Sequence, residues 1–441
     1  MSRSPRDTAF TVLSACRDLG AWSDGGLKKA IARDGLDSRD AAFASRLCYG
    51  VLQNRALLDQ RLGLFCTQRI DHLEAPVREV LRLGAYQLLL MDRVPANAAV
   101  SESVEQIRRV GKPQAAGLVN AVLRKLAANR DCLPLVTGRT EAERLSIQYS
   151  HPHWLTLRLV SLLGAEEAER FLAENNTPAP MTAQCNPLKT DEDACLAELR
   201  TCGVTAEPHP WMRGCYELGG SGDLEKLAAF REGRITIQDP AARLVSRAAG
   251  LRGGEFVIDV CAAPGGKSFA AAMEMRNSGR ILSCDVHGHK LRLIAEGAER
   301  LGISIIETAQ ADGRVPQEAL FGAADVVIAD VPCSGLGIIR KKPDIRYKDP
   351  AALKNLPAVQ AAILENASRY VKDGGVLLYS TCTILPEENE GVTAAFLQSH
   401  PAFRREAFTL PFGGEAAEIT LWPQRHRCDG FYICKMRKQN I

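Results

Sequence analysis

The chain has 441 residues, 46% of them hydrophobic and 24% charged, which is the composition of an ordinary globular protein and excludes a disordered one. No apolar run approaches the roughly 20 residues that a membrane-spanning helix needs, so we expect no membrane protein. The start, MSRSPRDTAF, lacks the apolar core of a secretory signal, and we expect no export. Fourteen cysteines without a Cys-x-x-Cys spacing are typical of reduced thiols, which predicts a cytoplasmic protein.

Charge is unevenly distributed along the chain. Residues 1–150 carry 22 Lys and Arg against 16 Asp and Glu, whereas the remainder carries 33 against 36. A basic N-terminal third beside a mildly acidic remainder points to a polyanionic partner. Solvated helices whose arginines serve solubility explain the same charges equally well, so charge alone leaves both interpretations open.

The first part of the chain has a helical pattern. Apolar residues recur three and four positions apart in Ala41–Leu52, Val77–Leu90 and Gly117–Leu126. Few β-branched runs interrupt them. We therefore predict an all-α bundle over residues 1–140.

The next part is mixed. The spacing predicts helices at Trp154–Leu163 and Glu166–Glu174, and the segment Asn175–Pro180 then breaks the chain. Short segments of both kinds follow. At roughly 150 residues per domain the length predicts about three domains, so we expect a small connecting α/β domain over residues 141–234.

From about Ile235 strands and helices alternate. Helical stretches such as Lys290–Leu301 and Ala351–Val371 lie between short apolar runs. The predicted strands are Phe256–Val260, Ile281–Cys284, Asp325–Ala329 and Val376–Tyr379. This alternation predicts a largely parallel sheet covered on both faces, over residues 235–441. The late run Phe431–Met436 is expected to add an antiparallel strand at the edge of the sheet.

A glycine-containing loop follows the first of these strands. It does not fit a phosphate-binding P-loop, because Cys261 stands where that loop needs its first glycine. A plain tight turn remains an alternative. Asp285, however, ends the second strand, where a carboxylate can accept both hydroxyls of a ribose. The loop and this carboxylate together predict a nucleoside site formed by Cys261, Ala262, Ala263, Pro264, Gly265, Gly266, Lys267 and Asp285.

Two cysteines directly follow two other predicted strands. Cys333 lies in Asp330–Gly335, and Cys382 lies in Ser380–Thr383. A single cysteine is usually a small buried hydrophobe, but two at equivalent strand ends beside a nucleoside site are hard to explain in that way. Histidines at zinc-ligand spacing are missing near them, so we predict no metal site. The pairs at 151 and 153 and at 287 and 289 are interpreted as structural.

At these residues the chain resembles the bacterial RNA cytosine-5 methyltransferases that use S-adenosylmethionine. The segments that carry the resemblance are CAAPGGK (261–267), ADVPCSG (329–335) and STCT (380–383). Segments at 49–52, 81–105, 118–126 and 149–155 are similar to the 16S ribosomal RNA branch of that family, of the Sun/Fmu (RsmB) type. Members of this branch carry a NusB-like helical RNA-binding domain in front of the catalytic domain.

The resemblance implies a fold and a set of roles. The fold is a NusB-like bundle, a connecting α/β domain and a Rossmann-like class I methyltransferase domain. Cys382 would be the nucleophile, Cys333 would assist release of the product, and Asp330 would lie between cofactor and base. The loop 261–267 would line the methionine and ribose parts of S-adenosylmethionine, Asp285 would hold the ribose hydroxyls and Asp312 would lie beside the adenine.

Basic residues follow the first cysteine. Arg340, Lys341, Lys342 and Arg346 are expected to hold RNA phosphates, against the alternative of a solvated basic loop. The acids Glu387, Glu388 and Glu390 follow Pro386, and we interpret them as the first turn of a helix rather than as catalytic groups.

Three other functions are alternatives to this one. The same chemistry on transfer RNA or on another ribosomal cytosine is the nearest one. An inactive RNA-binding or antitermination-type factor has no need for both cysteines, the loop and Asp285, and a P-loop nucleotidase conflicts with Cys261. The expected partner is 16S ribosomal RNA or an assembling small subunit, without membrane or metal, and we expect a monomer.

Overall fold

The computed structural model describes residues 4–19 and 23–440. The prediction of no export signal concerns a segment whose first residues, 1–3, lie outside this part. Contacts divide the chain into two compact units: unit 1 holds residues 1–177 and 339–348, and unit 2 holds residues 178–338 and 349–441. Within the described residues, no helix combines the length and apolar character needed to cross a membrane.

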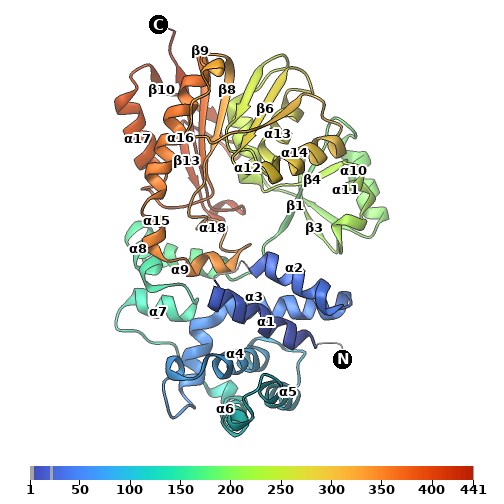
Figure 1. Ribbon diagram of the computed structural model, residues 1–441, viewed down its shortest axis with the longest axis vertical. Coiled ribbons are helices and arrows are strands. Elements are labelled where there is room, and N and C mark those ends of the chain that lie inside the picture. Colours follow the sequence, from blue (N-terminus) through green and yellow to red (C-terminus); the bar gives the residue numbers. More distant parts are fainter. Residues whose placement is uncertain (1–3, 20–22, 441) are drawn as a thin grey trace. The chain divides into compact units, whose positions relative to one another are not determined.

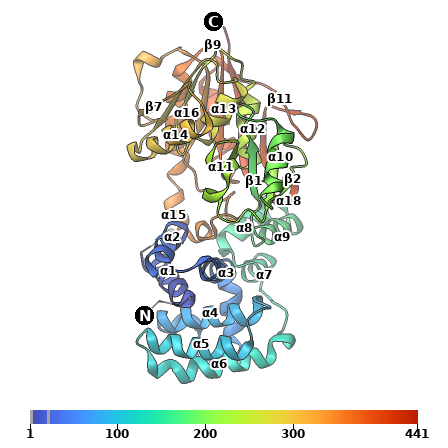
Figure 2. The same ribbon diagram turned by 90° about the vertical axis from the view of Figure 1, so that its right-hand side faces the viewer.

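Unit 1 is helical, as the spacing of its apolar residues predicts. Figure 2 shows α4, α5 and α6 side by side within it. Its α-helices are α1 (Pro5–Leu19), α2 (Ser23–Asp34), α3 (Ser38–Gly63), α4 (Ala75–Leu90), α5 (Ala96–Arg109), α6 (Ala116–Asn129), α7 (Glu141–Gln148), α8 (His153–Leu163) and α9 (Ala165–Glu174). The short 3₁₀ helix η6 (Pro343–Tyr347) belongs to the same unit.

Helix α4 is central to the bundle, because its side chains from Val77 to Leu88 are mostly buried. Gly84 lets neighbouring helices approach: a Cβ atom there would lie 2.5 Å from Cδ1 of Leu123 and 2.8 Å from Oγ of Ser103. The buried Arg82 on the same helix is neutralised by Glu79, 2.6 Å away. The helices predicted from Ala41, Val77 and Gly117 onward are all present in this unit.

Unit 2 begins with a small antiparallel sheet in the order β2-β3-β1-β4. The chain order β1-α10-β2-β3-α11-β4 and this strand order are those of a ferredoxin-like split βαβ fold. The elements are β1 (Met181–Cys185), α10 (Glu192–Thr201), β2 (Thr205–Pro208), β3 (Cys215–Gly219), α11 (Ala228–Arg231) and β4 (Ile235–Ile237). The domain boundaries at 140/141 and 234/235 remain predictions. Contacts group α7, α8 and α9, which follow the first predicted boundary, with unit 1.

The larger sheet of unit 2 has eight strands in the order β10-β14-β9-β8-β5-β6-β7, with β13 also paired to β14. Strands β5 to β9 are parallel, and β14 is antiparallel to β9. The eight strands are β5 (Phe256–Asp259), β6 (Arg280–Asp285), β7 (Ile306–Gln310), β8 (Ala324–Asp330), β9 (Val371–Thr381), β10 (Phe403–Arg405), β13 (Glu418–Leu421) and β14 (Phe431–Lys438). Two further strands, β11 (Phe408–Thr409) and β12 (Glu415–Ala416), form a separate pair.

Helices cover both faces of this sheet, as the alternating pattern predicts (Figure 1). One face packs on α12, α13 and α14, and the other packs on α16 and α17. The helices are α12 (Pro240–Ala249), α13 (Gly266–Glu274), α14 (Gly288–Leu301), α15 (Pro350–Leu353), α16 (Leu356–Tyr370), α17 (Glu390–Ser399) and α18 (Pro423–His426). The result is a Rossmann-like layered domain.

Three details differ from the sequence analysis. The strand at Phe431 is antiparallel, as predicted, but it is not at the edge, because β10 and β13 pair with it. The expected helix Ala351–Val371 is two helices, since Pro357 opens a new one, and Val371 begins β9. Strand β7 was not predicted, because its residues are mostly exposed and give no apolar run.

Candidate active site

The candidate site lies where the carboxyl ends of the parallel strands meet. Strand β5 is flanked by β6 on one side and β8 on the other, and this change in direction of the strand order is where such sheets bind ligands. The loops after β5, β6, β8 and β9 carry the residues that the sequence singled out. The fold therefore brings segments more than 100 residues apart to one edge.

The two cysteines lie together at this edge. Sγ of Cys333 is 3.2 Å from Sγ of Cys382, because β8 and β9 are neighbours and Asp330 is in register with Ser380. The backbone fixes this further: N–H of Gly337 donates to the carbonyl of Cys382 at 3.0 Å. The hydrogen bond with Cys382, together with burial, holds the pKa of the Cys333 thiol well above its ordinary value. Cys333 is therefore a protonated thiol that can donate to the Cys382 sulfur.

A buried ion pair lies beside the cysteines. Nζ of Lys267 is 2.5 Å from Oδ2 of Asp330, and the hydroxyl of Ser380 donates to Oδ1 of the same carboxylate at 2.8 Å. Burial alone would lower the pKa of Lys267, but the charges of Asp330 and Asp259 outweigh it, and the pKa is raised. The ammonium also lies 5.3 Å from the ring centre of Phe431. Asp330 thus accepts hydrogen bonds here as a carboxylate.

A second carboxylate, that of Asp259, interacts electrostatically with Lys267 of this pair. Asp259 ends β5, is fully buried, and accepts a hydrogen bond from Oγ of Ser268 at 2.8 Å. The hydroxyl of Ser283 donates in turn to Ser268. The other oxygen, Oδ1, is buried without a hydrogen-bond partner. Loss of solvation raises the pKa of Asp259 to about 7.

The loop after β5 has the form of a cradle for a nucleoside. Gly265 adopts φ +107°, and a Cβ atom there would lie 2.5 Å from the ring of Phe269, so the close turn requires glycine. The Asp285 carboxylate accepts from N–H of Ala263 at 3.2 Å and from N–H of His287 at 2.9 Å. Each carboxylate oxygen has a lone pair left for a ribose hydroxyl.

The loop after β7 closes the other side of the cradle. A Cβ atom on Gly313 would meet Sγ of Cys261 at 3.6 Å and Ile363 at 3.4 Å, so the glycine leaves space that a side chain would fill. The neighbouring Asp312 is held by Arg314, which also lowers the pKa of that carboxyl to about 2. The loops after β5, β6 and β7 therefore fit the adenosine part of a nucleoside cofactor.

Glu388 has a role that the sequence analysis missed. Of the three acids after Pro386, Glu390 lies in the first turn of α17, as predicted, but Glu387 and Glu388 lie in the turn before this helix. Glu388 lies before it, is 1% exposed and accepts hydrogen bonds from N–H of Ser334 and from Gln360. The only signal in the sequence was its place in the acidic run after Cys382.

The basic run after Cys333 belongs to unit 1 and divides into two kinds of residue. Lys341 and Lys342 are exposed. Arg340 is mostly buried, and its guanidinium lies 2.8 Å from Oε1 of Glu174. The two lysines are therefore the members of the run that remain accessible to phosphate.

The prediction that Arg346 holds RNA phosphates is wrong, because this residue is fully buried. Its guanidinium donates to the backbone carbonyls of Gln53 and Ser150 at 3.1 Å and of Tyr149 at 3.3 Å. It also donates to Oδ1 of Asn176 at 3.0 Å. Arg346 thus ties the segment 339–348 to α3 and to the end of α9.

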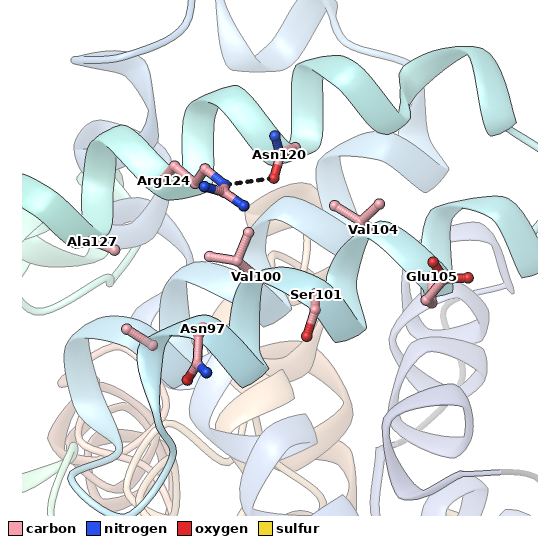
Figure 3. Close-up of a pocket in the computed structure, with 9 residues that line it drawn as sticks. Asn97, Val100, Ser101, Val104, Glu105, Asn120, Arg124 and Ala127 are labelled. Atoms are coloured by element: carbon pink, nitrogen blue, oxygen red, sulfur yellow. Dashed lines mark hydrogen bonds between the residues drawn. The ribbon is translucent and has the colours of Figure 1, made fainter.

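Unit 1 also contains a groove of about 360 Å³ between α5 and α6. Figure 3 shows Asn120 and Arg124 on α6 facing Val100 and Val104 on α5, with Arg124 donating to Asn120 at 2.9 Å. Its one carboxylate, Glu105, is paired with Arg108. The residues that line the groove include no cysteine or histidine, so the chemistry is assigned to the cysteine site.

Within the described residues, no group of three or more His, Cys, Asp or Glu side chains is arranged to hold a metal ion. The histidines at 287 and 289 lie near each other with ring centres 5.7 Å apart, outside any such group.

Models of three families match the chain. The family described as 16S rRNA methyltransferase RsmB/F matches residues 249–437, and the NusB family matches residues 3–128. The ferredoxin-like domain of RsmF/B-like methyltransferases matches residues 151–225. These matches agree with the three kinds of architecture in the structure.

Individual proteins match over nearly the whole chain. The probable ribosomal RNA small subunit methyltransferase B of Bacillus subtilis (strain 168) is 34% identical, over 99% of each chain. The ribosomal RNA small subunit methyltransferase B of Sodalis glossinidius is also 34% identical, over 92% of this chain and 91% of that one. The crystal structure of PH0851 is similar with a TM-score of 0.80 and 26% identity, over 99% of this chain and 100% of that one.

Proposed function

Because the chain belongs to the family of ribosomal RNA small subunit methyltransferases B, we propose that it methylates carbon 5 of one cytosine in 16S ribosomal RNA through a covalent bond to Cys382. The observation that carries this proposal is the pair of sulfur atoms 3.2 Å apart at the ends of two neighbouring strands. One thiol can attack the base while the other assists its release. Simple methyl transfer to an oxygen or an exocyclic nitrogen needs no such pair.

The methyl donor is S-adenosylmethionine, which supplies an electrophilic methyl group on a sulfonium when bound. The loop from Cys261 to Lys267 would line its methionine and ribose parts. Asp285 would accept the ribose hydroxyls with its remaining lone pairs. Asp312 would lie beside the adenine, next to the space that Gly313 leaves.

The chemistry follows from the weak nucleophilicity of carbon 5. The Cys382 sulfur adds to carbon 6, the electron pair moves onto the ring, and ring nitrogen 3 takes a proton. Carbon 5 then has enamine character and bonds to the methyl group. Transfer of the carbon 5 proton to water, return of the nitrogen 3 proton to the Lys267–Asp330 pair and cleavage of the bond between sulfur and carbon 6 restore the ring. Cys333 assists this elimination.

The Lys267–Asp330 ion pair is suited to the proton on nitrogen 3. Because the Lys267 ammonium contacts Oδ2 of Asp330, the proton would come from Lys267 through that oxygen.

The RNA must present an unstacked base, because neither face of a stacked cytosine is accessible. Lys341 and Lys342 are the exposed cations of the run after Cys333, and they would contact backbone phosphates without reading sequence. The basic NusB-like bundle would select the RNA by shape. The protein would act in the cytoplasm as a monomer on ribosomal RNA or an assembling subunit.

The test is methyl transfer from labelled S-adenosylmethionine to unmodified small-subunit ribosomal RNA, followed by bisulfite mapping. We expect a single new 5-methylcytosine with the wild-type protein and none with Cys382→Ala. Transfer only to transfer RNA would keep the chemistry and overturn the substrate. Wild-type turnover by Cys382→Ala would overturn the covalent mechanism, and silence on every RNA despite cofactor binding would favour an inactive RNA-binding factor.

A further inference from the structure

Glu388 lies in the turn between β9 and α17, and its carboxylate is out of contact with solvent, since the residue is 1% exposed. A buried carboxylate is costly unless hydrogen-bond donors satisfy it. Donors from both cysteine loops and from α16 do so here. Glu388 thus contacts the loops of Cys333 and Cys382 together.

The first set of bonds holds both neighbours of Cys333. N–H of Ser334 donates to Oε2 of Glu388 at 2.9 Å. Nε2 of Gln360 donates to the same oxygen at 2.8 Å and to the carbonyl of Pro332 at 3.0 Å. The residues before and after Cys333 are therefore fixed through one carboxylate oxygen and one amide.

The second set holds the residue after Cys382. Oγ1 of Thr383 donates to Oε1 of Glu388 at 3.4 Å. The same hydroxyl lies 2.6 Å from Oγ of Ser334, which links the residues that directly follow the two cysteines. All of these groups are buried, so water does not compete for the bonds.

The turn itself is fixed to the sheet. The hydroxyl of Tyr379, on β9, donates to the backbone carbonyl of Glu388 at 2.6 Å. Nδ2 of Asn389 donates to the carbonyl of Thr383 at 3.1 Å, and Thr381 donates to Oδ1 of Asn389 at 2.6 Å. Glu388 therefore has little freedom to move relative to β9, and it transmits that rigidity to the Cys333 loop.

We propose that Glu388 is a positioning residue that sets the separation and orientation of Cys333 and Cys382. The proposal rests on the function proposed above and deepens it, because the same two sulfurs act in that reaction. Reactive groups must be held to within a fraction of an ångström, and a misplacement of 1 Å can cost about 100-fold in rate. Glu388 does not touch the base or the cofactor in this role.

The effect of the Glu388 charge on the pKa of Cys333 supports the same assignment. The hydrogen bond to Cys382, burial and, to a smaller extent, the carboxylate of Glu388 raise the pKa of the Cys333 thiol. A neutral side chain at position 388 removes the last of these contributions. An apolar side chain there also leaves N–H of Ser334 and the Gln360 amide without the acceptor that they share, Oε2 of Glu388.

The first experiment measures the separation of the sulfurs without using the reaction. Diamide takes one hydrogen from each thiol, becomes a hydrazine, and leaves a disulfide between Cys333 and Cys382, which peptide mass spectrometry quantifies. We expect equal rates in the wild type and in Glu387→Gln, whose side chain is exposed in the same turn. Glu388→Ala should cross-link at least tenfold more slowly. Equal rates in Glu388→Ala and the wild type would overturn the proposal.

The second experiment separates this proposal from the proposed function. RNA with 5-fluorocytidine retains the bond between Cys382 and carbon 6, because fluorine cannot leave as the proton does. Absence of a covalent complex with the wild type would contradict the proposed function, while the diamide rates still decide the role of Glu388. A complex that forms equally fast with Glu388→Met and the wild type would contradict positioning. We expect Glu388→Met, which removes the acceptor of Ser334 and Gln360 and keeps a side chain of similar length, to be slowed severalfold with unchanged cofactor affinity, and it serves if Glu388→Ala does not fold.

Discussion

The ammonium nitrogen of Lys267 lies 2.5 Å from Oδ2 of Asp330, although Lys267 is on α13, which follows β5, and Asp330 ends β8. Their side chains are 13% and 26% exposed. Such a pair is held in a medium of low polarity, where removal of one partner leaves the other charge uncompensated. The pair therefore has a structural and a chemical role that can be separated.

Replacement of one partner should affect stability and rate together. We expect Lys267→Met to destabilise the protein by about 3 kcal/mol and to slow methyl transfer by about 100-fold or more. The double variant Lys267→Met with Asp330→Asn should regain most of the stability but not the rate. Melting and single-turnover assays check this, with the exposed Lys354→Met as control. Recovery of the rate in the double variant would exclude a catalytic role for the pair.

Loss of the second thiol should trap the reaction. We expect Cys333→Ala to accumulate a covalent adduct between Cys382 and RNA, because the elimination that releases the product is slowed while the attack remains possible. A denaturing gel with labelled RNA detects the adduct. The exposed Cys202→Ala serves as control and should give none. Turnover at the wild-type rate with no trapped species would count against the role of Cys333.

We expect Arg346 to contribute to the stability of the folded protein rather than to RNA binding. Arg346→Met leaves three backbone carbonyls and the Asn176 side chain without their buried donor, and we expect a loss of about 3 kcal/mol or more. The neighbouring Lys342→Met should leave the melting temperature unchanged and lower the dependence of RNA affinity on salt by about one phosphate contact. Thermal melting and filter binding at several salt concentrations measure the two effects. An Arg346→Met variant as stable as the wild type would contradict this assignment.

Asp259 should make the stability depend on pH. Its pKa is raised to about 7 in the folded chain, mainly by burial, against about 3.9 in the unfolded chain. Between these values the folded state keeps a proton that the unfolded state has lost, so stability falls as pH rises, by at most about 1.4 kcal/mol per pH unit. The melting temperature of Asp259→Asn relative to wild type should therefore increase from pH 5 to pH 7. A difference that stays constant over this range would contradict the shift.

Cofactor affinity should distinguish the two carboxylates of the cradle. We expect Asp285→Ala to weaken S-adenosylmethionine binding by at least about tenfold, since hydrogen bonds to a charged group are worth about 1.5–3 kcal/mol. Asp312→Ala should have a smaller effect, because Arg314 already occupies that carboxylate. Asp312 is ionised above its pKa of about 2, so its contribution should not vary between pH 5 and 8. Calorimetric titration of both variants against wild type decides the order.

Periodicity predicted which segments are helices and strands, because burial of one face leaves a repeat in the sequence. It failed where burial gave no repeat. The mostly exposed β7 was missed, and Phe431–Met436 was expected at an edge although β10 and β13 pair with this strand. Pairing of strands far apart in the chain leaves no local signal of this kind.

The sequence by itself determined that two cysteines, a glycine turn and Asp285 follow strands of one sheet, because residue type and strand length are local properties. Only the tertiary structure decided that β8 and β9 are neighbours, which brings the two sulfur atoms to 3.2 Å. The tertiary structure also decided which charged residues are buried and which are exposed. Arg346 is buried against backbone carbonyls, whereas Lys342 is exposed, and Glu388 joins both cysteine loops. Burial and hydrogen bonding depend on segments that meet only in the folded chain, and a run of charged letters does not contain that information.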